Sequence, residues 1–473
     1  MKNIKRILAI TLICVMACSC KKSFLELSPE SNANANNFYK TKADFEVAIN
    51  SAYATLYVIY APEEAVSYTE IMSDEGTLYA VAGAQADKWA IRDYTTTASN
   101  TLVYQYWQDY YKALFNINNV LDKIQAAGLD ADYTNHVKAE MMFLRGLYYY
   151  NMVQLFGGVP LVTKVVSADE SYGILRSPTA DVYTQIVTDL KFAVDNLPLA
   201  NAVPAAGRAS KGAAETVLGK VYLSMGNKTG AAQVLQDVYN SGQYSLLPQY
   251  TSLFGPNVKN TKESVFEIQY LGGAASNPFS PYWTAFAPVT NGVITKYGGG
   301  INQVTDDLYN EYEAGDPRRD ASIETGYTDA KGNFVKIKFP KKWEDRTAPT
   351  SGTQELSNNN FMVLRYADVL LLLSEATGDA TYLNQVRARV GLGAFGSAEY
   401  PSAQYPTLAL AVEHERKVEL AMEFHRFFDL KRTGRALPVL TAKGKAVTEQ
   451  RLILPIPQYV ITQNSKITQN PGY

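Results

Sequence analysis

The most chemically dense stretch of the sequence is "EHERKVELAMEFHRFFD", residues 413–429. Its first His-Glu pair matches the start of a metalloprotease HExxH motif, but Val418 occupies the place of the second histidine, which excludes that motif. Glu415, Glu419 and Glu423 follow one another at four-residue spacing and therefore share one helix face. Paired carboxylates can hydrolyse a glycoside when they lie about 5–10 Å apart across the sugar.

The same stretch also allows a structural interpretation. Arg416 and Arg426 alternate with its acidic residues, and interleaved opposite charges usually join a helix to its neighbours. Possible partners elsewhere in the chain are Arg365, Asp368 and Glu375. We favour this interpretation, and we predict no catalytic residue, no metal site and no cofactor, so the protein is not expected to be an enzyme.

All three cysteines lie in "CVMACSC", as Cys14, Cys18 and Cys20. A zinc site usually needs a fourth ligand, and no later cysteine is present to form a disulfide. The cysteines instead follow a basic segment, "MKNIKR", and an apolar segment, "ILAITLICVMA", which together are typical of a secretory signal. The apolar run of about a dozen residues is too short to span a bilayer, which takes about 20 residues.

A cysteine at the cleavage site resembles a bacterial lipobox, in which a small residue precedes the cysteine that receives the lipid. Two registers fit, one with Ala17 before Cys18 and one with Ser19 before Cys20. A plain signal peptide with incidental cysteines is the alternative. A multiply acylated cysteine would anchor the protein durably, whereas one lipid chain anchors only marginally.

The charge of the chain argues against nucleic acid as a partner. The 473 residues include 44 basic and 46 acidic side chains, so the formal net charge is −2. Without a basic field, the electrostatic attraction that nucleic acid binding requires is absent. The chain also contains 33 tyrosines, whose apolar ring and polar tip suit both helix packing and wet binding surfaces.

Apolar residues at spacings of three and four predict a mainly helical protein. Such stripes predict helices over 45–56, 107–124 and 186–197, and further helices are expected over 361–376 and 408–434. Trp107 lies on one of these stripes and is therefore expected in the core. Between 255 and 360 Gly, Pro, Asn and Ser dominate, and "FVKIKF" (334–339) predicts a short strand.

Residues 213–239 match the offsets of a tetratricopeptide repeat, a 34-residue helical hairpin. The small residues Gly219 and Ala231 would allow its two helices to approach closely. The pattern departs at Glu215, where a Trp is usual, and at Gln243, where a Pro is usual. Several stacked hairpins of this kind are expected, and such stacks often bind proteins.

The order of several motifs resembles the SusD/RagB family of outer-membrane lipoproteins. These motifs are "SFLELSPE", "FLRGLYYYNMVQLFGGVPLV", "GRASKGAAETVLGKVYL", "VLRYADVLLLLSEA", "LNQVRARVGL", "ERKVELAMEFHRFFDLKRTG", "LPIP" and "TQNPGY". The resemblance implies a mostly α-helical fold with tetratricopeptide-like units, and binding of an oligosaccharide or a peptide at the cell surface. It also implies a SusC-like TonB-dependent transporter as the partner. The spacing of "FLE" from the anchor in this family favours Cys20 over Cys18 as the lipidated residue.

A sugar ligand would need aromatic rings for its flat C–H faces and planar polar side chains for its hydroxyls. Two loop regions combine such residues outside clear helical periodicity. The first, residues 70–100, offers Asp74, Trp89 and Arg92, and the second, residues 277–299, offers Tyr282, Trp283 and Tyr297. Loop packing or contact with the transporter is the alternative for each aromatic, and Trp343 fits either interpretation.

The expected fold is mainly α, with tetratricopeptide-like hairpins and an irregular insertion of loops and short strands. The expected regions are a signal peptide with lipobox (1–20), a tether (21–37), a tetratricopeptide-like region (38–254), a ligand-binding region (255–360) and a C-terminal helical region (361–473). We expect a lipid-anchored outer-membrane protein that binds a glycan and delivers it to the transporter. The two alternatives are a surface glycoside hydrolase and a scaffold that binds only protein.

Overall fold

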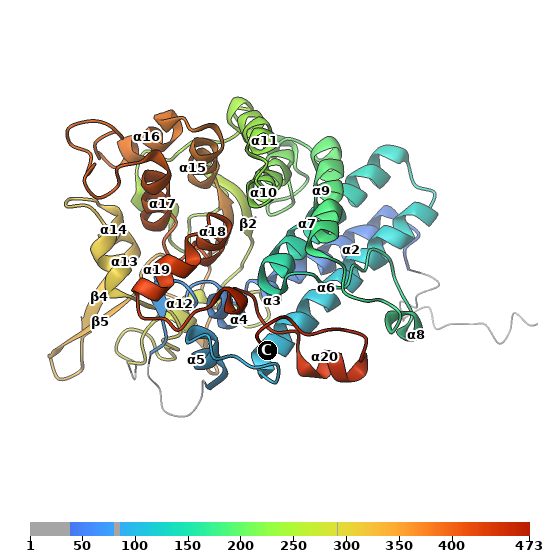
Figure 1. The fold of residues 1–473 in the computed structure, drawn as a ribbon, viewed down its shortest axis with the longest axis horizontal. Coiled ribbons are helices and arrows are strands. Elements are labelled where there is room, and N and C mark those ends of the chain that lie inside the picture. The colour runs from blue at the N-terminus through green and yellow to red at the C-terminus, as the bar shows by residue number, and fades with distance from the viewer. Residues whose placement is uncertain (1–37, 80–85, 291) are drawn as a thin grey trace, which may run out of the picture.

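The computed structural model describes residues 38–79, 86–290 and 292–473 (Figure 1). The expected signal peptide and tether, and with them Cys18 and Cys20, lie outside these residues. Helices dominate the described chain and the strands are few and short, so the prediction of a mainly α fold is confirmed. Within the described ranges, no helix combines the length and apolar character that crossing a bilayer requires.

The first half of the chain is a set of antiparallel helices. Its elements are α2 (Lys42–Ala54), α3 (Leu56–Ile59), α4 (Pro62–Tyr68), β1 (Gly76–Thr77), α5 (Ala86–Arg92), α6 (Thr101–Ala126), α7 (Ala131–Phe156), α8 (Ala168–Ser171), α9 (Thr179–Asn196), α10 (Lys211–Ser224) and α11 (Lys228–Asn240). Helix α7 packs on α6 and α9, and α10 packs on α9 and α11, which forms the layer at the right and top of Figure 1. The predicted apolar stripes lie on α2, α6 and α9, except that Leu56 begins α3 and Leu197 is the C-cap of α9, and Trp107 is buried as expected.

The predicted tetratricopeptide-like hairpin is α10 and α11. Each helix begins at a side-chain cap, since Ser210 Oγ accepts from Ala213 N and Asn227 Oδ1 accepts from Gly230 N. A Cβ atom on Gly219 would lie 2.6 Å from Leu235 Cγ on the facing helix. Glycine is therefore what allows the two helices to pack as closely as they do.

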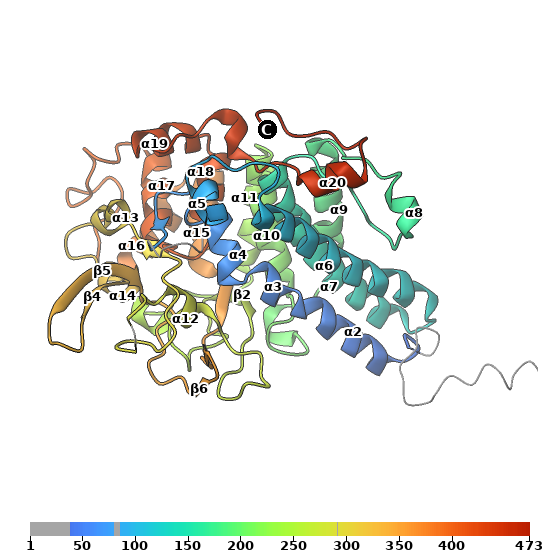
Figure 2. The ribbon, with the colours of Figure 1, turned by 90° about the horizontal axis from the view of Figure 1, so that it is seen from below.

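The middle of the chain contributes short elements joined by loops. They are β2 (Ser264–Ile268), α12 (Tyr282–Phe286), β3 (Gln303–Val304), α13 (Asp306–Glu311), α14 (Arg318–Ser322), β4 (Ile323–Thr328), β5 (Phe334–Pro340), β6 (Thr350–Ser351) and β7 (Gln354–Glu355). The strands pair antiparallel, as β1 with β3, β2 with β8, β4 with β5, and β6 with β7. The strand predicted from "FVKIKF" is β5, whose hairpin with β4 projects from the molecule in Figure 2.

The last part of the chain returns to helices. Its elements are β8 (Phe361–Arg365), α15 (Tyr366–Thr377), α16 (Ala380–Arg389), α17 (Leu408–Glu419), α18 (Arg426–Arg432), α19 (Ala436–Ala442) and α20 (Gln458–Gln463). Short 3₁₀ turns occur at Ala200–Ala202, Tyr250–Leu253 and Glu449–Leu452. Helix α15 packs on α11, α16 and α17, so it joins this part to the helical layer of the first half.

The single helix expected over 361–376 is in fact a strand followed by a helix. Residues Phe361–Arg365 form β8, because β2 offers them an antiparallel partner, with Ile268 opposite Phe361. The helix α15 starts only at Tyr366, whose N–H donates to the carbonyl of Glu263. An apolar run of this length does not by itself separate a buried strand from a buried helix.

The helix expected over 408–434 is also interrupted. Helix α17 ends at Glu419 and α18 begins at Arg426, and between them Met422 and Phe424 adopt positive φ angles of 65° and 67°. Their backbone N–H groups donate to two buried carboxylates from the first half of the chain, Glu75 and Glu70. These tertiary hydrogen bonds stabilise a left-handed backbone that few non-glycine residues adopt.

Candidate functional site

The carboxylates of α17 lie in a buried network of charges. Arg365 donates to Glu423 Oε2 at 2.7 Å, and Arg318 donates to Glu419 Oε2 at 2.9 Å. Burial would raise the pKa of Glu419, but three neighbouring arginines hold it well below its usual range. A glycosidase acid needs a raised pKa and access to a sugar, and the Glu419 side chain has neither. The network supports the structural interpretation of this stretch.

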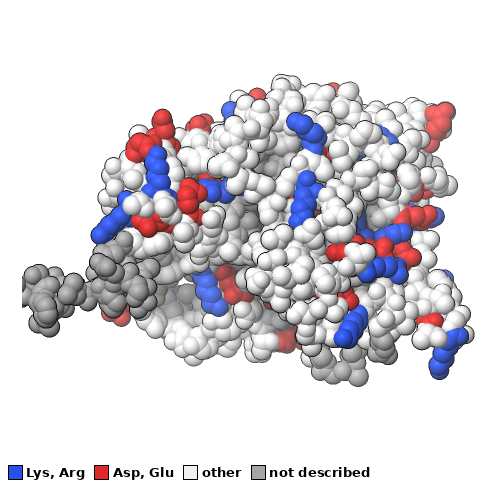
Figure 3. All heavy atoms as spheres, turned by 180° about the vertical axis from the view of Figure 1, so that it is seen from behind, with Lys and Arg blue, Asp and Glu red and all other residues white. Residues whose placement is uncertain are grey.

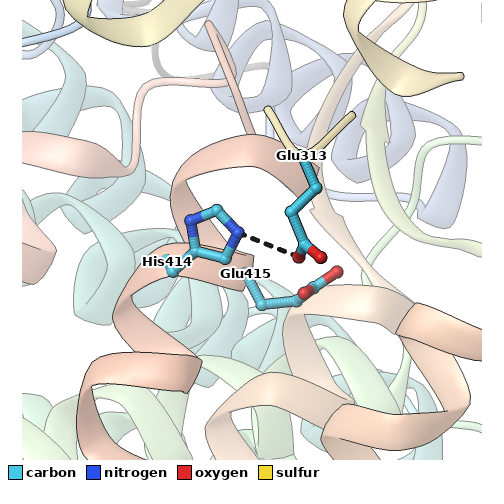
Figure 4. Close-up of side chains that lie close together, drawn as sticks. All are labelled: Glu313, His414 and Glu415. Carbon is cyan, nitrogen blue, oxygen red and sulfur yellow. Dashed lines mark hydrogen bonds and ion pairs between the residues drawn. The ribbon is translucent and has the colours of Figure 1, made fainter. Parts of the chain in front are cut away.

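Figure 4 shows the side chains of Glu313, His414 and Glu415 close together, and one ligand atom of each lies within 4.8 Å of the others. His414 Nε2 lies 3.3 Å from Glu313 Oε1, and the Arg387 guanidinium lies 2.7 Å from Glu313 and 2.9 Å from Glu415. Burial would lower the pKa of His414, but hydrogen bonds to Glu311 and Glu313 raise it. Arginine already supplies the positive charge here that a metal ion would supply, so the cluster is a charge network.

A groove of about 650 Å³ lies between α5, the β1–β3 ribbon and the turn after α19. We call it the α5 groove, and its lining includes Thr77, Arg92, Asp93, Thr305, Asp307 and Lys443. The ribbon is held by Gly76 opposite Val304 and by Thr305, whose hydroxyl donates to the carbonyl of Asp74 at 2.7 Å. Hydroxyls, carboxylates and cations alternate along this lining, which is a suitable set of partners for a polyhydroxylated ligand.

Arg92 and Trp89 are neighbours on the exposed side of α5. The Arg92 guanidinium lies 4.7 Å from the centroid of the Trp89 ring and 3.1 Å from the carboxylate of Asp93. Stacking of this kind fixes the plane of the guanidinium. Asp87 joins α5 to the start of α6, because its carboxylate accepts from Thr101 N at 2.9 Å. The predicted pair Trp89 and Arg92 is therefore partly exposed and rigidly placed.

Asp74 lies at the floor of the α5 groove and is buried. Arg426 donates to its carboxylate at 2.8 Å, and Lys417 lies at 2.8 Å. Burial would raise the pKa of Asp74, but these two cations hold it well below its usual range. The structure thus corrects the expected accessibility of Asp74, whose carboxylate is occupied by two internal cations.

The structure makes the same correction for Tyr282 and Trp283 in α12. The Tyr282 ring is fully buried and stacks on Phe361 at 4.8 Å, and its hydroxyl donates to the carbonyl of Tyr60. Trp283 packs in a second, smaller cluster with Phe339. Neither ring presents a face to solvent, because the glycine-rich segment around α12 folds them inward. Trp343, which fitted either interpretation, is also buried.

Tyr297 is half-buried at the protein surface, and its hydroxyl donates to the carbonyl of Gly352. Lys296 lies 5.2 Å from the centroid of its ring. Tyr79, which the sequence did not single out, is 37% exposed and packs beside Gly300 at the end of the β1–β3 ribbon. Tyr79 and Tyr297 are thus surface aromatics on the loops that flank the ribbon.

Sequence reasoning also missed the groove residues that lie far from the two predicted loops. Lys443 pairs with Asp307 at 2.6 Å, and Lys445 Nζ donates to the carbonyl of Ile71. Burial lowers the pKa of Lys445 to about 7. No local pattern marks these residues as binding residues, since they follow or begin short helices. Tyr79 carried a usable signal, because it is an aromatic within the predicted loop 70–100.

Comparison with known proteins gives the family. A family model described as "Starch-binding associating with outer membrane" matches residues 23–223, and a model described as "SusD family" matches residues 324–473. A solved structure described as a laminarin-binding SusD-like protein is 30% identical, with a TM-score of 0.80, and the match covers 92% of this chain and 100% of that chain. The chain belongs to the SusD/RagB family.

Other relatives of this SusD-family chain agree in length and fold. SusD-like protein P2 of Formosa agariphila is 27% identical over 100% of both chains. The surface glycan-binding protein A of Bacteroides thetaiotaomicron, solved with laminarihexaose, has a TM-score of 0.77 at 22% identity. That match covers 91% of this chain and 99% of the other, and it shows a shared fold.

Proposed function

We propose that this SusD-family protein binds an oligosaccharide at the outer surface of the cell and delivers it to a SusC-like TonB-dependent transporter. The observation that carries the proposal is the α5 groove, whose lining residue Arg92 is stacked on the half-buried Trp89 beside the groove. A relative with 30% identity is described as binding laminarin, which supports a glycan as the ligand class. Trp89, Arg92 and Tyr297 are the proposed contact residues among the six predicted ones.

The charges of the α5 groove favour an uncharged glycan. Lys443 pairs with Asp307, Arg92 with Asp93, and Asp306 with Lys338, so most charges of the lining have a partner of opposite sign. The formal net charge is only −2, and on the rear face in Figure 3 basic and acidic side chains are mixed. The surface therefore has no electric field of a single sign. A sulfated or uronic-acid polymer would gain no long-range attraction from such a surface.

Titration with laminarihexaose tests the proposed site. Trp89→Ala should weaken the affinity about tenfold or more, because burying an aromatic face is worth about 1.5–3 kcal/mol. Arg92→Ala should have an effect of similar size, because hydrogen bonds from a charged donor contribute about 1.5–3 kcal/mol. Matched controls are Phe334→Ala, which removes an exposed ring from the β4–β5 hairpin, and Arg346→Ala, which removes an exposed guanidinium. These controls should bind as the wild type does.

The same experiment separates the alternatives. Unchanged affinity in both α5 variants would move the site elsewhere, and a wild type that binds no glycan on an array would contradict glycan capture. Release of shorter sugars during incubation would favour the glycoside hydrolase. Binding of the transporter without any glycan affinity would favour a protein-only scaffold.

The membrane attachment is proposed to be a lipid on Cys20, with Cys18 as the alternative. The matched family description associates these proteins with the outer membrane. A durable anchor there would keep the α5 groove close to the transporter and raise the effective concentration of captured sugar. Co-purification of the protein with the neighbouring transporter from outer membranes tests this part of the proposal.

A further inference from the structure

Exposed aromatic residues gather on one side of the molecule, away from the α5 groove. Phe115 on α6 is 52% exposed, Tyr459 on α20 is 55% exposed, and Tyr172 directly after α8 is 51% exposed. Single exposed apolar residues need no explanation, but several on one face indicate a binding surface. In Figures 1 and 2, α20 lies beside the first half of α6, and α8 lies on the same side of the molecule beyond α20.

Contacts between these elements link Tyr459 to the start of α6 and Tyr172 to the end of α20. The Tyr459 ring lies 4.9 Å from the Tyr104 ring at the start of α6. Asn464 at the end of α20 donates to the carbonyl of Tyr172 at 3.0 Å. One turn before Phe115, the Tyr111 hydroxyl donates to the carbonyl of Pro160, which places the segment leading to α8 along the same helix.

Five positions of α6 form a regular row, in which Phe115 is exposed and the other four side chains are half-buried. Tyr104, Gln108, Tyr111, Phe115 and Asn119 recur at spacings of four, three, four and four, which is one helix face, and we call this row the α6 stripe. Eleven residues separate Tyr104 from Phe115, which is about 16 Å along the helix axis at about 1.5 Å per residue. Several units of an extended sugar chain would cover that length.

The chemistry of the α6 stripe suits a sugar better than a protein partner. Its order is ring, amide, ring, ring and amide, and Gln108 donates to the Tyr104 hydroxyl at 2.7 Å. The core of a protein interface is usually a continuous, well-packed apolar patch, whereas here an amide interrupts the row of rings and another ends it. The charges beside the row, Asp109 and Lys112, pair with each other at 3.3 Å, so the surface favours an uncharged ligand.

We propose that the α6 stripe, with Tyr459 and Tyr172, is a second carbohydrate-binding surface that takes an extended, uncharged polysaccharide chain. It rests on the proposed glycan capture but shares no lining residue with the α5 groove. The segment leading into α20 contacts the segment after α5, because Arg451 and Gln458 N donate to the carbonyls of Thr96 and Ala98. One long chain that occupies both surfaces is held more tightly than a short one, since its second contact is intramolecular.

The test compares a long and a short probe on the same proteins. The chain produced from residue 21 onward, which contains every described residue, is titrated with laminarin and with laminarihexaose. The double variant Phe115→Ala/Tyr459→Ala should bind laminarihexaose as the wild type does and laminarin about tenfold more weakly or worse. Phe334→Ala is the matched control, because it removes an equally exposed ring from the β4–β5 hairpin on the opposite side of the molecule in Figure 1.

Any of the following results would overturn the proposal of a second surface. Unchanged laminarin affinity in the double variant overturns it while leaving the α5 groove intact as a site. Loss of co-purification with the transporter, at unchanged laminarin affinity, would show that the stripe binds protein instead. A wild type that binds neither probe contradicts glycan capture by this chain for these glucans, and the second surface with it. Thermal unfolding of both variants checks that the fold is unchanged.

Discussion

At the scale of single residues, burial decides which of the predicted contact residues can reach a ligand. The sequence predicts six contact residues on the premise that loops usually lie at the surface. Trp89 and Arg92 do lie at the surface, whereas Tyr282 and Trp283 are in the core. A large ring in a glycine-rich segment gains more from burial than from exposure, and the sequence does not show which way the backbone turns it.

Histidine protonation gives a prediction at this scale. Burial lowers the pKa of His425 to about 4, and the Lys220 ammonium at 3.0 Å from its Nδ1 adds to the effect. An unfolded histidine has a pKa of about 6.5, so between about pH 6.5 and pH 4 the unfolded chain binds a proton that the folded chain does not. The free energy of unfolding should therefore decrease as the pH is lowered from about 6.5 to about 4, by about 1.4 kcal/mol per pH unit at most.

Urea unfolding at several pH values measures this effect. His425→Gln should flatten the decline between about pH 6.5 and pH 4 relative to the wild type. His414→Gln is the comparison of opposite sign, because Glu311 and Glu313 raise the pKa of His414 and its stabilisation is lost as pH rises through the folded value. Identical pH profiles for the wild type and His425→Gln would show that His425 does not titrate as its surroundings imply.

At the scale of elements, periodicity predicted the long helices and tertiary pairing decided the short elements. Helices α6, α9 and the α10–α11 hairpin follow stripes that are visible in the sequence. Strand β8 and the break between α17 and α18 depend on distant partners, namely β2 and the carboxylates of Glu70 and Glu75. The region boundaries at 254 and 360 stay a proposal, and β2 and β8 pair across the second of them.

Close packing in the α10–α11 hairpin gives the prediction at this scale. Gly219→Ala should lower the free energy of unfolding by about 1–3 kcal/mol, because the new methyl group meets the Leu235 side chain at 2.6–3.1 Å. Leu235→Ala alone should cost about 2–5 kcal/mol through the cavity it leaves. The double variant should cost less than the sum, since the smaller side chain makes room for the methyl group.

Urea denaturation of the four proteins in this cycle tests the expected coupling. Lys228→Ala at the exposed start of α11 is a control that should change stability little. If the two changes in the free energy of unfolding are additive, the helices move apart to accommodate the methyl group and do not keep their spacing.

At the scale of the whole molecule, the buried ion network joins parts that are distant in sequence. Arg365 from β8, Glu419 from α17 and Glu263 from the segment before β2 meet in the interior without exposure to solvent. Breaking such a buried pair by removing one partner usually costs about 3–5 kcal/mol, because it leaves an uncompensated charge. The many charged side chains of residues 413–429 therefore stabilise the packing of the helical layer, the short strands and the C-terminal helices against one another.

Attachment to the membrane gives the prediction for the whole protein. Cys20→Ala should leave the fold intact, because every described element lies after residue 37, and should release the protein from the outer membrane. Fractionation of cells that lack the transporter measures the release, and circular dichroism checks the fold. Cys18→Ala is the matched control and should stay membrane-bound. Retention of the Cys20→Ala protein with the outer membrane would contradict Cys20 as the anchor.

The sequence by itself determined the helical class and the family, and it predicted Trp89 and Arg92 as contact residues on a loop, whereas the structure places both on helix α5. These features follow from local periodicity, from the order of the motifs and from residue chemistry, and all three can be read directly from the sequence. Only the tertiary structure decided that Asp74, Tyr282 and Trp283 are internal, and that Lys443 and Asp307 join Arg92 in one groove. The physical reason is that burial and ion pairing depend on which distant segments contact each other, and local sequence patterns do not determine those contacts.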